Sequence, residues 1–195
     1  MTKFGIDIRE DLLDNEANGM ARRGVLHTAH GDVNTPCFMP VGTVAAMKAM
    51  HFDQLKNTGA EIMLCNTYHL MIQGRFEVID KMGGLHKFMN WDRPILTDCG
   101  GFQAMSLSKL NKKNEKGVTF RCHLSGQKYE LTPEFSMEIQ HKLDTDITMA
   151  LDECVQQPAD YKYTKKSMER SLRWARRSRD AFVEREGYGI YGIVQ

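Results

Sequence analysis

Several features that assign a chain to a specialised class are missing from these 195 residues. No apolar run is long enough to cross a membrane, and the first residues lack the apolar core of a signal peptide. Lysine and arginine (26) nearly balance aspartate and glutamate (25), so the net charge of +1 neither indicates nor excludes a nucleic-acid partner. No internal repeat, low-complexity tract or linker stands out. The sequence therefore predicts a cytoplasmic protein with one domain, or part of one.

The cysteines exclude two further classes. They are odd in number, widely spaced, and form no Cys-x-x-Cys pair, so neither a disulfide framework nor a zinc knuckle is supported. Most lie in or beside apolar segments, which predicts small buried thiols that stay reduced. We assign no metal ligand in this chain. The five are Cys37, Cys65, Cys99, Cys122 and Cys154.

Short apolar runs alternate with helical patterns along the chain, and residues 52–57 are one such helical pattern. Alternation of this kind indicates βα units around a parallel sheet. A (β/α)8 barrel of the TIM type needs eight strands and about 250 residues, so we expect an α/β fold that is an incomplete barrel. An open sheet ending on a bare strand would leave one face poorly covered. The expected strands are residues 35–41, 61–65, 95–97, 147–151 and 189–195.

Two helices and a hairpin complete the expected fold. Residues 118–131 alternate around the turn signal Ser125-Gly126, which predicts an inserted β-hairpin. The sequence Thr132-Pro133-Glu134 then opens a helix with a cap, a first-turn proline and an acid. The apolar face of that helix is Phe135, Ile139 and Leu143.

A longer helix is expected at residues 164–186, with an apolar face and a basic face. The basic face is either solvated, which is the commoner case, or turned toward a phosphate backbone. The apolar face is Met168, Leu172, Ala175 and Phe182. The basic face is Lys165, Lys166, Arg170, Arg173, Arg176, Arg177 and Arg179.

Polar side chains follow the predicted strands. Because the carboxyl ends of parallel strands share one rim, we expect these side chains to converge. Carboxylates, an imidazole and amides on one rim suit recognition of a planar heterocycle, with acid–base catalysis of glycosidic cleavage nearby. The residues are Asn66, Thr67 and His69 after the second expected strand, Asp98 and Phe102 after the third, Asp152 and Glu153 after the fourth, and Gln195 at the end of the fifth.

The densest motif is residues 94–103, Pro-Ile-Leu-Thr-Asp-Cys-Gly-Gly-Phe-Gln. An apolar strand ends in Asp98, and Gly100 and Gly101 then let a flat ligand approach the backbone. Phe102 offers a ring for stacking, and the amide after it offers hydrogen bonds. A tight turn with a solvated aspartate is the alternative, and turn glycines are common enough to make the two equally plausible for this motif alone.

Further motifs extend over nearly the whole chain. They are PVGT at 40–43, NTYHL at 66–70, GLHKFMNWDRPILTDCGGFQ at 84–103, GVTFR at 117–121, LTPE at 131–134, DEC at 152–154, SMERSLRWA at 167–175 and GIVQ at 192–195. In these motifs the sequence resembles the tRNA-guanine transglycosylases, also called queuine tRNA-ribosyltransferases, and the bacterial type fits best.

The resemblance implies a (β/α)8 barrel enzyme that exchanges guanine at the wobble position of certain tRNAs for a 7-deazaguanine base, the queuosine precursor. It implies a double displacement in which one aspartate attacks the ribose C1′ and a second, at the position of Asp98, is the general acid/base. The implied partners are a tRNA anticodon loop, the 7-deazaguanine base and a second copy in a homodimer. The implied base-binding positions are Asp98, Cys99, Gly100, Gly101, Phe102, Asp152 and Gln195.

Other parts of the family pattern are missing or altered. The nucleophilic aspartate and the zinc site of three cysteines and a histidine lie further along in the family. We therefore expect residues 1–195 to be the N-terminal portion of one transglycosylase barrel domain, inactive alone. Cys99 and Cys122 stand where serine is usual, Ser125 replaces an aspartate and Gln73 a proline. A thiol is a weaker hydrogen-bond partner than a hydroxyl.

Two other interpretations stay open. One is a non-catalytic half that binds the base and is completed by another chain. The other is an unrelated barrel enzyme such as an aldolase-type lyase. The lack of a Schiff-base lysine at a strand end, together with Phe102, argues against the lyase.

Overall fold

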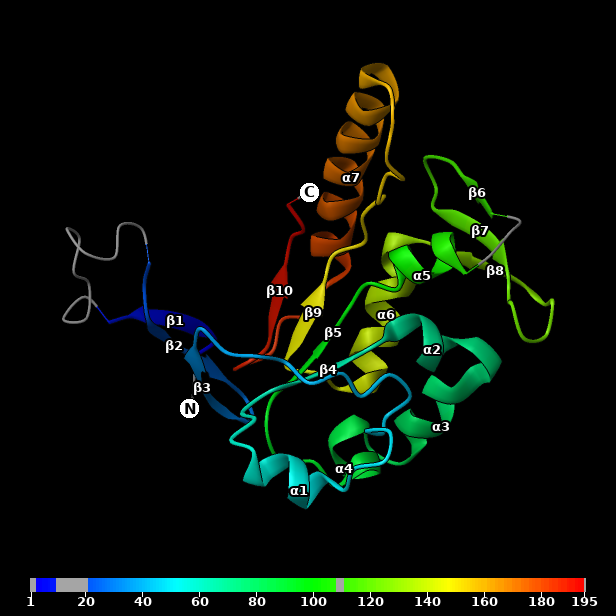
Figure 1. The fold of residues 1–195 in the computed structure, drawn as a ribbon. Helices are drawn as coiled ribbons and strands as arrows, with labels where there is room; N and C mark the ends of the chain where they lie inside the picture. The colour runs from blue at the N-terminus through cyan, green and yellow to red at the C-terminus, as the bar shows by residue number, and fades with distance from the viewer. Residues whose placement is uncertain (1–2, 10–20, 108–110, 195) are drawn as a thin grey trace.

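Four parallel strands form the centre of the fold (Figure 1). The computed structural model describes residues 3–9, 21–107 and 111–194. The four strands are hydrogen-bonded in the spatial order β4-β5-β9-β10, which is also their order in the chain. They are β4 (Met63–Cys65), β5 (Ile95–Thr97), β9 (Ile147–Met149) and β10 (Gly189–Tyr191).

This strand order decides where the helices lie. Right-handed crossovers between strands that follow one another in space put the connecting helices on one face of the sheet. A doubly wound sheet would instead reverse its strand order and carry helices on both faces. Here α3 packs against α6, and α6 packs against α7. The predicted α/β class with a parallel sheet is thus confirmed.

The helices are short except for the last two. They are α1 (Phe52–Asn57), α2 (Thr67–Met71), η2 (Ile72–Gly74), α3 (Arg75–Lys81), α4 (Leu85–Met89), α5 (Gly101–Ser106), α6 (Pro133–Leu143) and α7 (Tyr161–Ala181). The predictions for α1 and α6 are confirmed. Thr132 caps α6, because its hydroxyl oxygen accepts a hydrogen bond from the Phe135 N–H at 3.1 Å. Ile139 and Leu143 are buried, as their spacing predicts.

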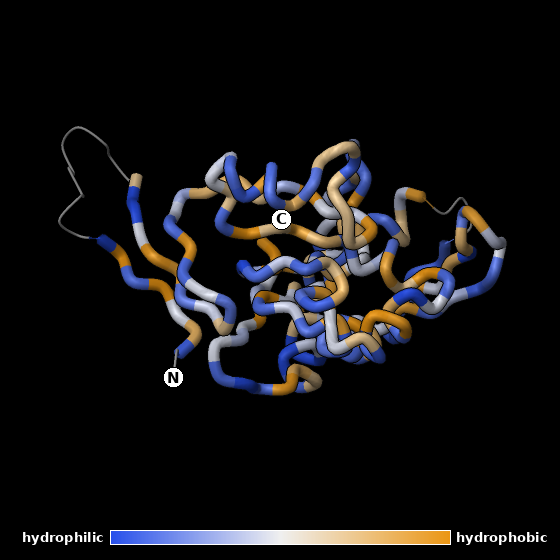
Figure 2. Tube along the Cα trace, turned by 90° about the horizontal axis from the view of Figure 1, so that it is seen from below, coloured by the Kyte–Doolittle hydropathy of each residue, from blue (hydrophilic) through white to orange (hydrophobic). Residues whose placement is uncertain are grey.

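The core lies on both faces of the central sheet. Figure 2 shows hydrophobic positions along the segments in the middle of the chain trace. Met63, Cys65 and Ile95 belong to the cluster that the helices cover. Leu96 and Ile147 belong to a second cluster, together with residues of a small antiparallel sheet that extends to one side in Figure 1. That sheet consists of β1 (Gly5–Ile8), β2 (Gly24–Thr28) and β3 (Gly31–Thr35).

The predicted hairpin is confirmed, with one strand more than expected. Its two strands are antiparallel, and a third strand pairs with the first of them. The three are β6 (Asn111–Lys113), β7 (Val118–Arg121) and β8 (Lys128–Leu131). Strand β7 packs against α5, which follows β5, so the sheet lies beside the end of β5 that carries the candidate site.

The prediction of a strand at residues 35–41 is wrong. Thr35 ends β3, and further on only Val41 makes an isolated parallel bridge, to Leu64 of β4. Pro36 and Pro40 lack the N–H that a strand ladder needs, so the segment cannot pair along its length. The predicted strand at 95–97 coincides with β5, and the other three predicted strands are present as β4, β9 and β10 but shorter than expected.

The predicted apolar face of the long helix is also wrong. Helix α7 begins at Tyr161 and ends at Ala181. Met168 and Leu172 are 52% and 58% exposed, whereas the buried positions are Ser167, Trp174 and Ser178. Serines are buried here because their hydroxyls bind the backbone of the segment that follows β9, as described below. The inner face of α7 therefore combines serines with one large aromatic side chain, Trp174.

The basic face of α7 is partly used within the chain. Arg173 forms a bidentate ion pair with Glu115, and Arg177 forms one with Glu134. Arg177 also donates to the Glu115 carbonyl at 2.7 Å. These guanidinium groups hold the inserted sheet and α6 against α7, which weakens the argument for a phosphate-binding stripe.

Candidate functional site

Asp98 lies directly after β5, where its carboxylate is held by neighbouring donors. Its Oδ2 accepts from the Asn66 side-chain amide at 2.6 Å, and its Oδ1 accepts from the Thr67 N–H at 2.8 Å. The Gly100 N–H also donates to Oδ1, at 3.2 Å. Asn66 and Thr67 follow β4, the neighbouring strand, so adjacent strand ends meet as predicted. Sequence reasoning placed both residues on the rim but gave them no role.

The environment of Asp98 favours its protonated form. Burial raises the pKa of this carboxyl, and the hydrogen bonds from Asn66, Thr67 and Gly100 oppose the rise without cancelling it. A carboxyl that keeps its proton to higher pH than usual is suited to general acid–base chemistry.

Cys99 connects Asp98 to the end of the next strand. Its buried thiol donates to the Asp152 Oδ1 at a sulfur–oxygen distance of 3.3 Å. Burial, followed by the charge of Asp152, raises the pKa of the thiol, so it remains a donor. Asp152 itself is only 6% exposed. The residue that departs from the usual serine therefore still provides a hydrogen bond to this carboxylate, although a weak one.

The two glycines lie in close packing, and the first of them also has a left-handed backbone. Gly100 has a φ of +77°, and a Cβ there would lie 3.1 Å from the Tyr68 nitrogen. A Cβ on Gly101 would lie 3.0 Å from the Asp152 carbonyl oxygen. Phe102, which follows, is 57% exposed, so its side chain is accessible for stacking. The Gln103 Oε1 is buried without a partner among the described residues.

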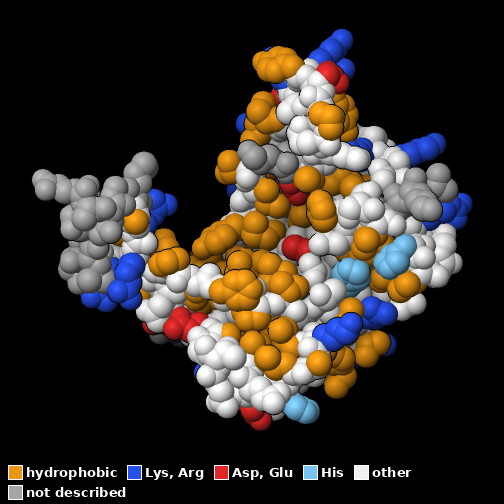
Figure 3. Space-filling view, in the orientation of Figure 1, with side chains coloured by type: hydrophobic (Ala, Val, Ile, Leu, Met, Phe, Trp, Pro, Cys, Tyr) orange, Lys and Arg blue, Asp and Glu red, His pale blue; other side chains and the backbone are white. Residues whose placement is uncertain are grey.

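The predicted site residues thus converge in part. Asp98, Cys99 and Asp152 lie together, with the two glycines between β5 and α5. His69 lies near enough for the charge of Asp98 to act on it, and burial lowers the pKa of its imidazole. Gln195 lies outside the described residues. Figure 3 shows this face as a hollow with hydrophobic side chains, an acidic side chain among them and histidines toward one side.

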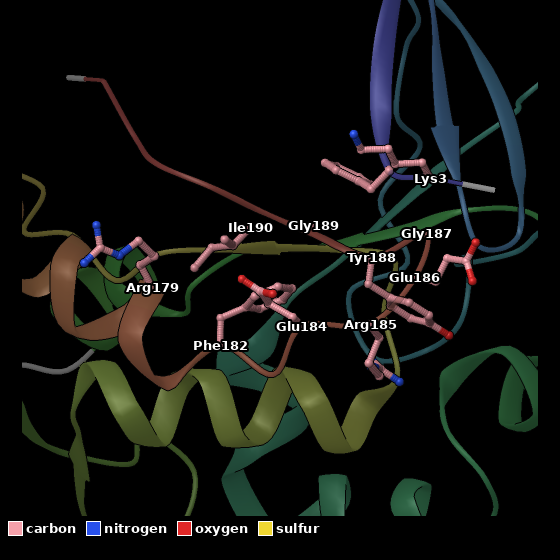
Figure 4. Close-up of a pocket in the computed structure, with 11 residues that line it drawn as sticks. Lys3, Arg179, Phe182, Glu184, Arg185, Glu186, Gly187, Tyr188, Gly189 and Ile190 are labelled. Carbon is pink, nitrogen blue, oxygen red and sulfur yellow. The ribbon is translucent and has the colours of Figure 1, made fainter. Parts of the chain in front are cut away.

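One cavity borders this rim, and another lies far from it. The cavity that borders the rim has a volume of about 520 Å³ and is lined by Phe102, Lys113 and Cys154, among others. The other, of about 660 Å³, lies at the amino end of β10, between Phe4 and the segment 184–190 (Figure 4). It is at the opposite end of the strand from the candidate site, so we do not include it in the site.

Comparison with known proteins agrees with the resemblance. The sequence model of the family "Queuine tRNA-ribosyltransferase" matches residues 16–195. The chain belongs to this family. It is 61% identical to the queuine tRNA-ribosyltransferase of Rickettsia typhi over 195 residues, which are 100% of this chain and 52% of the relative. It is 58% identical to that of Granulibacter bethesdensis over 178 residues, 91% of this chain and 47% of the relative.

The comparison also shows how much of each relative this chain covers. The chain spans about half the length of the curated relatives it matches. Among the helices in the described part of the chain, none combines the length and the apolar character that crossing a membrane would require.

The zinc ion that the family resemblance implies does not fit the described residues. Their one group of three potential ligands is His30, His86 and Asp146. The two imidazole rings are stacked, with centroids 3.5 Å apart and planes 17° apart, so one ion cannot lie in the plane of both. Both Asp146 oxygens also accept backbone N–H groups, from His30 at 3.0 Å and Ile95 at 2.9 Å. The group fits a buried ion pair.

Proposed function

We propose that this chain carries the base-binding part of a tRNA-guanine transglycosylase, which exchanges guanine at the wobble position of tRNA for a 7-deazaguanine base. The observation that carries the proposal is the meeting of Asp98 and Asp152 through Cys99 at the ends of two neighbouring strands. Two carboxylates beside a pair of packed glycines and an exposed aromatic ring suit a flat base with N–H donors on its edge. The family membership supports the same assignment.

In the proposed reaction Asp98 is the general acid/base. It gives a proton to the departing guanine and takes one from the incoming base, so its own protonation state is restored. The raised pKa supports the acidic step. The base-binding residues are proposed to be residues 98–102, Asp152 and Gln195, with Phe102 stacking on the base. The target nucleotide must leave its stack to reach such a site.

The remaining parts of the reaction are proposed to come from outside this chain. These are the strands that close the (β/α)8 barrel, the nucleophilic aspartate, and the zinc site of three cysteines and a histidine. Exposed apolar side chains at the two edges of the sheet support a continuing barrel: Val41, which bridges to β4, is 47% exposed, and Tyr191 of β10 is 37% exposed. The complete protein is proposed to act on tRNA in the cytoplasm, as a homodimer.

The same exposed edges favour a second candidate. In it, the chain is a non-catalytic half that binds the base and pairs with another chain. Unpaired strand edges with apolar flanks are sites of such pairing. The two candidates share the base site and differ in where the nucleophile comes from.

Titration of the purified chain with guanine tests the base site. Asp152→Ala is expected to weaken binding by about 1–3 kcal/mol, the cost of an unpaired buried hydrogen-bonding group. Asp80→Ala, at an exposed position of α3, is the matched control and is expected to leave the affinity unchanged. Equal affinities of wild type and Asp152→Ala would overturn the proposed base site.

A further inference from the structure

The carboxylate that follows Asp152 is buried and fully bound. Glu153 is 1% exposed. Its Oε1 accepts from the Tyr163 hydroxyl at 2.8 Å and lies 3.2 Å from the Lys113 Nζ. Its Oε2 accepts from the Arg170 Nη1 at 2.6 Å. Such a carboxylate cannot move without breaking contacts to two other elements, β6 and α7.

The backbone on either side of Asp152 is held as well. The Glu153 N–H donates to the Ser171 Oγ at 2.9 Å, and the Ser167 hydroxyl donates to the Glu153 carbonyl at 3.1 Å. The Leu151 N–H donates to the Ser178 Oγ at 3.2 Å. Both neighbours of Asp152 are therefore fixed on the inner face of α7. This leaves the Asp152 side chain directed at Cys99.

The charges in this group are balanced by cations from two elements. Burial raises the pKa of Glu153, but hydrogen bonds from Tyr163 and Lys113 outweigh it and hold the pKa below its usual range. Glu153 is therefore an anion. Lys113 comes from the inserted sheet, and its Nζ also donates to the Tyr163 hydroxyl at 3.0 Å. Lys113 also lines the cavity beside Phe102, so it links the inserted sheet both to Glu153 and to the cavity at the candidate site.

We propose that Lys113, Tyr163 and Arg170 are positioning residues for base binding: they hold Glu153 and so fix the loop that carries Asp152. The inference rests on the proposed base site and adds to it residues that are not among the proposed base contacts. It gives the inserted sheet a role, because β6 places Lys113 over the loop. It also explains why the inner face of α7 carries serines.

The test is titration of the 195-residue chain with guanine, with unfolding by urea measured on the same samples. Lys113→Met is expected to weaken guanine binding about tenfold, since small displacements of a positioned group are costly. Tyr163→Phe, which removes one hydroxyl, is expected to weaken binding in the same direction. Lys113→Arg is expected to restore binding toward wild type. Lys112→Met, an exposed neighbour on β6, is the matched control and is expected to bind like wild type.

The outcomes separate this inference from the base site itself. If Lys113→Met and Tyr163→Phe lower the stability but bind guanine like wild type, the residues are merely structural and the inference is wrong. If Lys113→Met does not fold, Tyr163→Phe decides alone. If Asp152→Ala also binds like wild type, or wild type binds no guanine, the proposed base site fails and this inference fails with it.

Discussion

Replacing Asp146 with asparagine should destabilise the chain strongly. Asp146 is fully buried and accepts four hydrogen bonds, two of them from the backbone. The other two come from the His30 Nδ1 at 2.8 Å and the His86 Nε2 at 3.1 Å. In Asp146→Asn one carboxylate oxygen becomes an NH2 group. The two N–H groups that donated to that oxygen then face a donor and lose their acceptor. Each costs about 1–3 kcal/mol, and breaking a buried ion pair costs about 3–5 kcal/mol.

We therefore expect Asp146→Asn to lower the free energy of unfolding by about 3–5 kcal/mol, measured by urea denaturation. The matched control is Asp32→Asn, which removes the partner of His27 at an exposed site and should leave stability unchanged. A loss of unfolding free energy below about 1 kcal/mol at neutral pH would show that Asp146 is not a buried anion that depends on its hydrogen-bond donors, and would refute this reasoning.

The loss should also depend on pH. Burial raises the pKa of Asp146, but the hydrogen bonds from His30 and His86 outweigh burial and hold it well below its usual range. Its contribution is therefore complete above about pH 4 and is lost as the pH falls through the folded-state pKa. The hydrogen bond to Asp146 raises the pKa of His30. The stability that protonated His30 contributes is therefore complete below about pH 6.5 and is lost as the pH rises through the folded-state pKa. Asp144 and Arg185 also act on His30, in opposite directions. The difference between wild type and variant should be largest from about pH 4 to 6.5, and a constant difference would contradict this assignment.

Three further predictions concern the fold. Trp174→Ala should cost about 3–5 kcal/mol of unfolding free energy. Leu172→Ala should cost less than about 0.5 kcal/mol because Leu172 is exposed. Similar losses for the two variants in urea denaturation would contradict the assignment of the inner face of α7. Thr132→Ala should cost about 1 kcal/mol through loss of the α6 cap, and an unchanged midpoint in thermal unfolding would show that the cap is not needed. Excess zinc should leave the thermal midpoint of the chain unchanged, because the His30, His86 and Asp146 group does not fit the ion; a rise with zinc concentration would show binding to the folded state.

Local signals in the sequence were sufficient for several elements. The Thr132-Pro133-Glu134 cap places the start of α6, and the apolar run at 95–97 coincides with β5. The rule that parallel strand ends share a rim brings Asp98 near Asp152, as the Cys99 contact confirms. The roles of these residues in base binding stay predictions.

The errors and omissions have a common physical cause. A helix pattern predicts burial from apolar residues, but the inner face of α7 is decided by a loop that needs hydroxyl partners. The pairing of His30 with Asp146 spans 116 positions of the chain and leaves no local pattern. Lys113 likewise lies in a short polar strand that the sequence did not predict. Non-local polar contacts of this kind become visible only once the fold is known.

The measurement that tests the central claim most directly is guanine exchange in a chimera. This chain replaces the matching segment of the Rickettsia typhi relative, to which it is 61% identical, and incorporation of labelled guanine into tRNA is followed. The chimera is expected to exchange guanine, and Asp98→Asn is expected to slow exchange by about a hundredfold or more, as for loss of a general acid/base, with the chimera still folded. Exchange by Asp98→Asn at the unmodified rate would remove Asp98 from the chemistry and contradict the account.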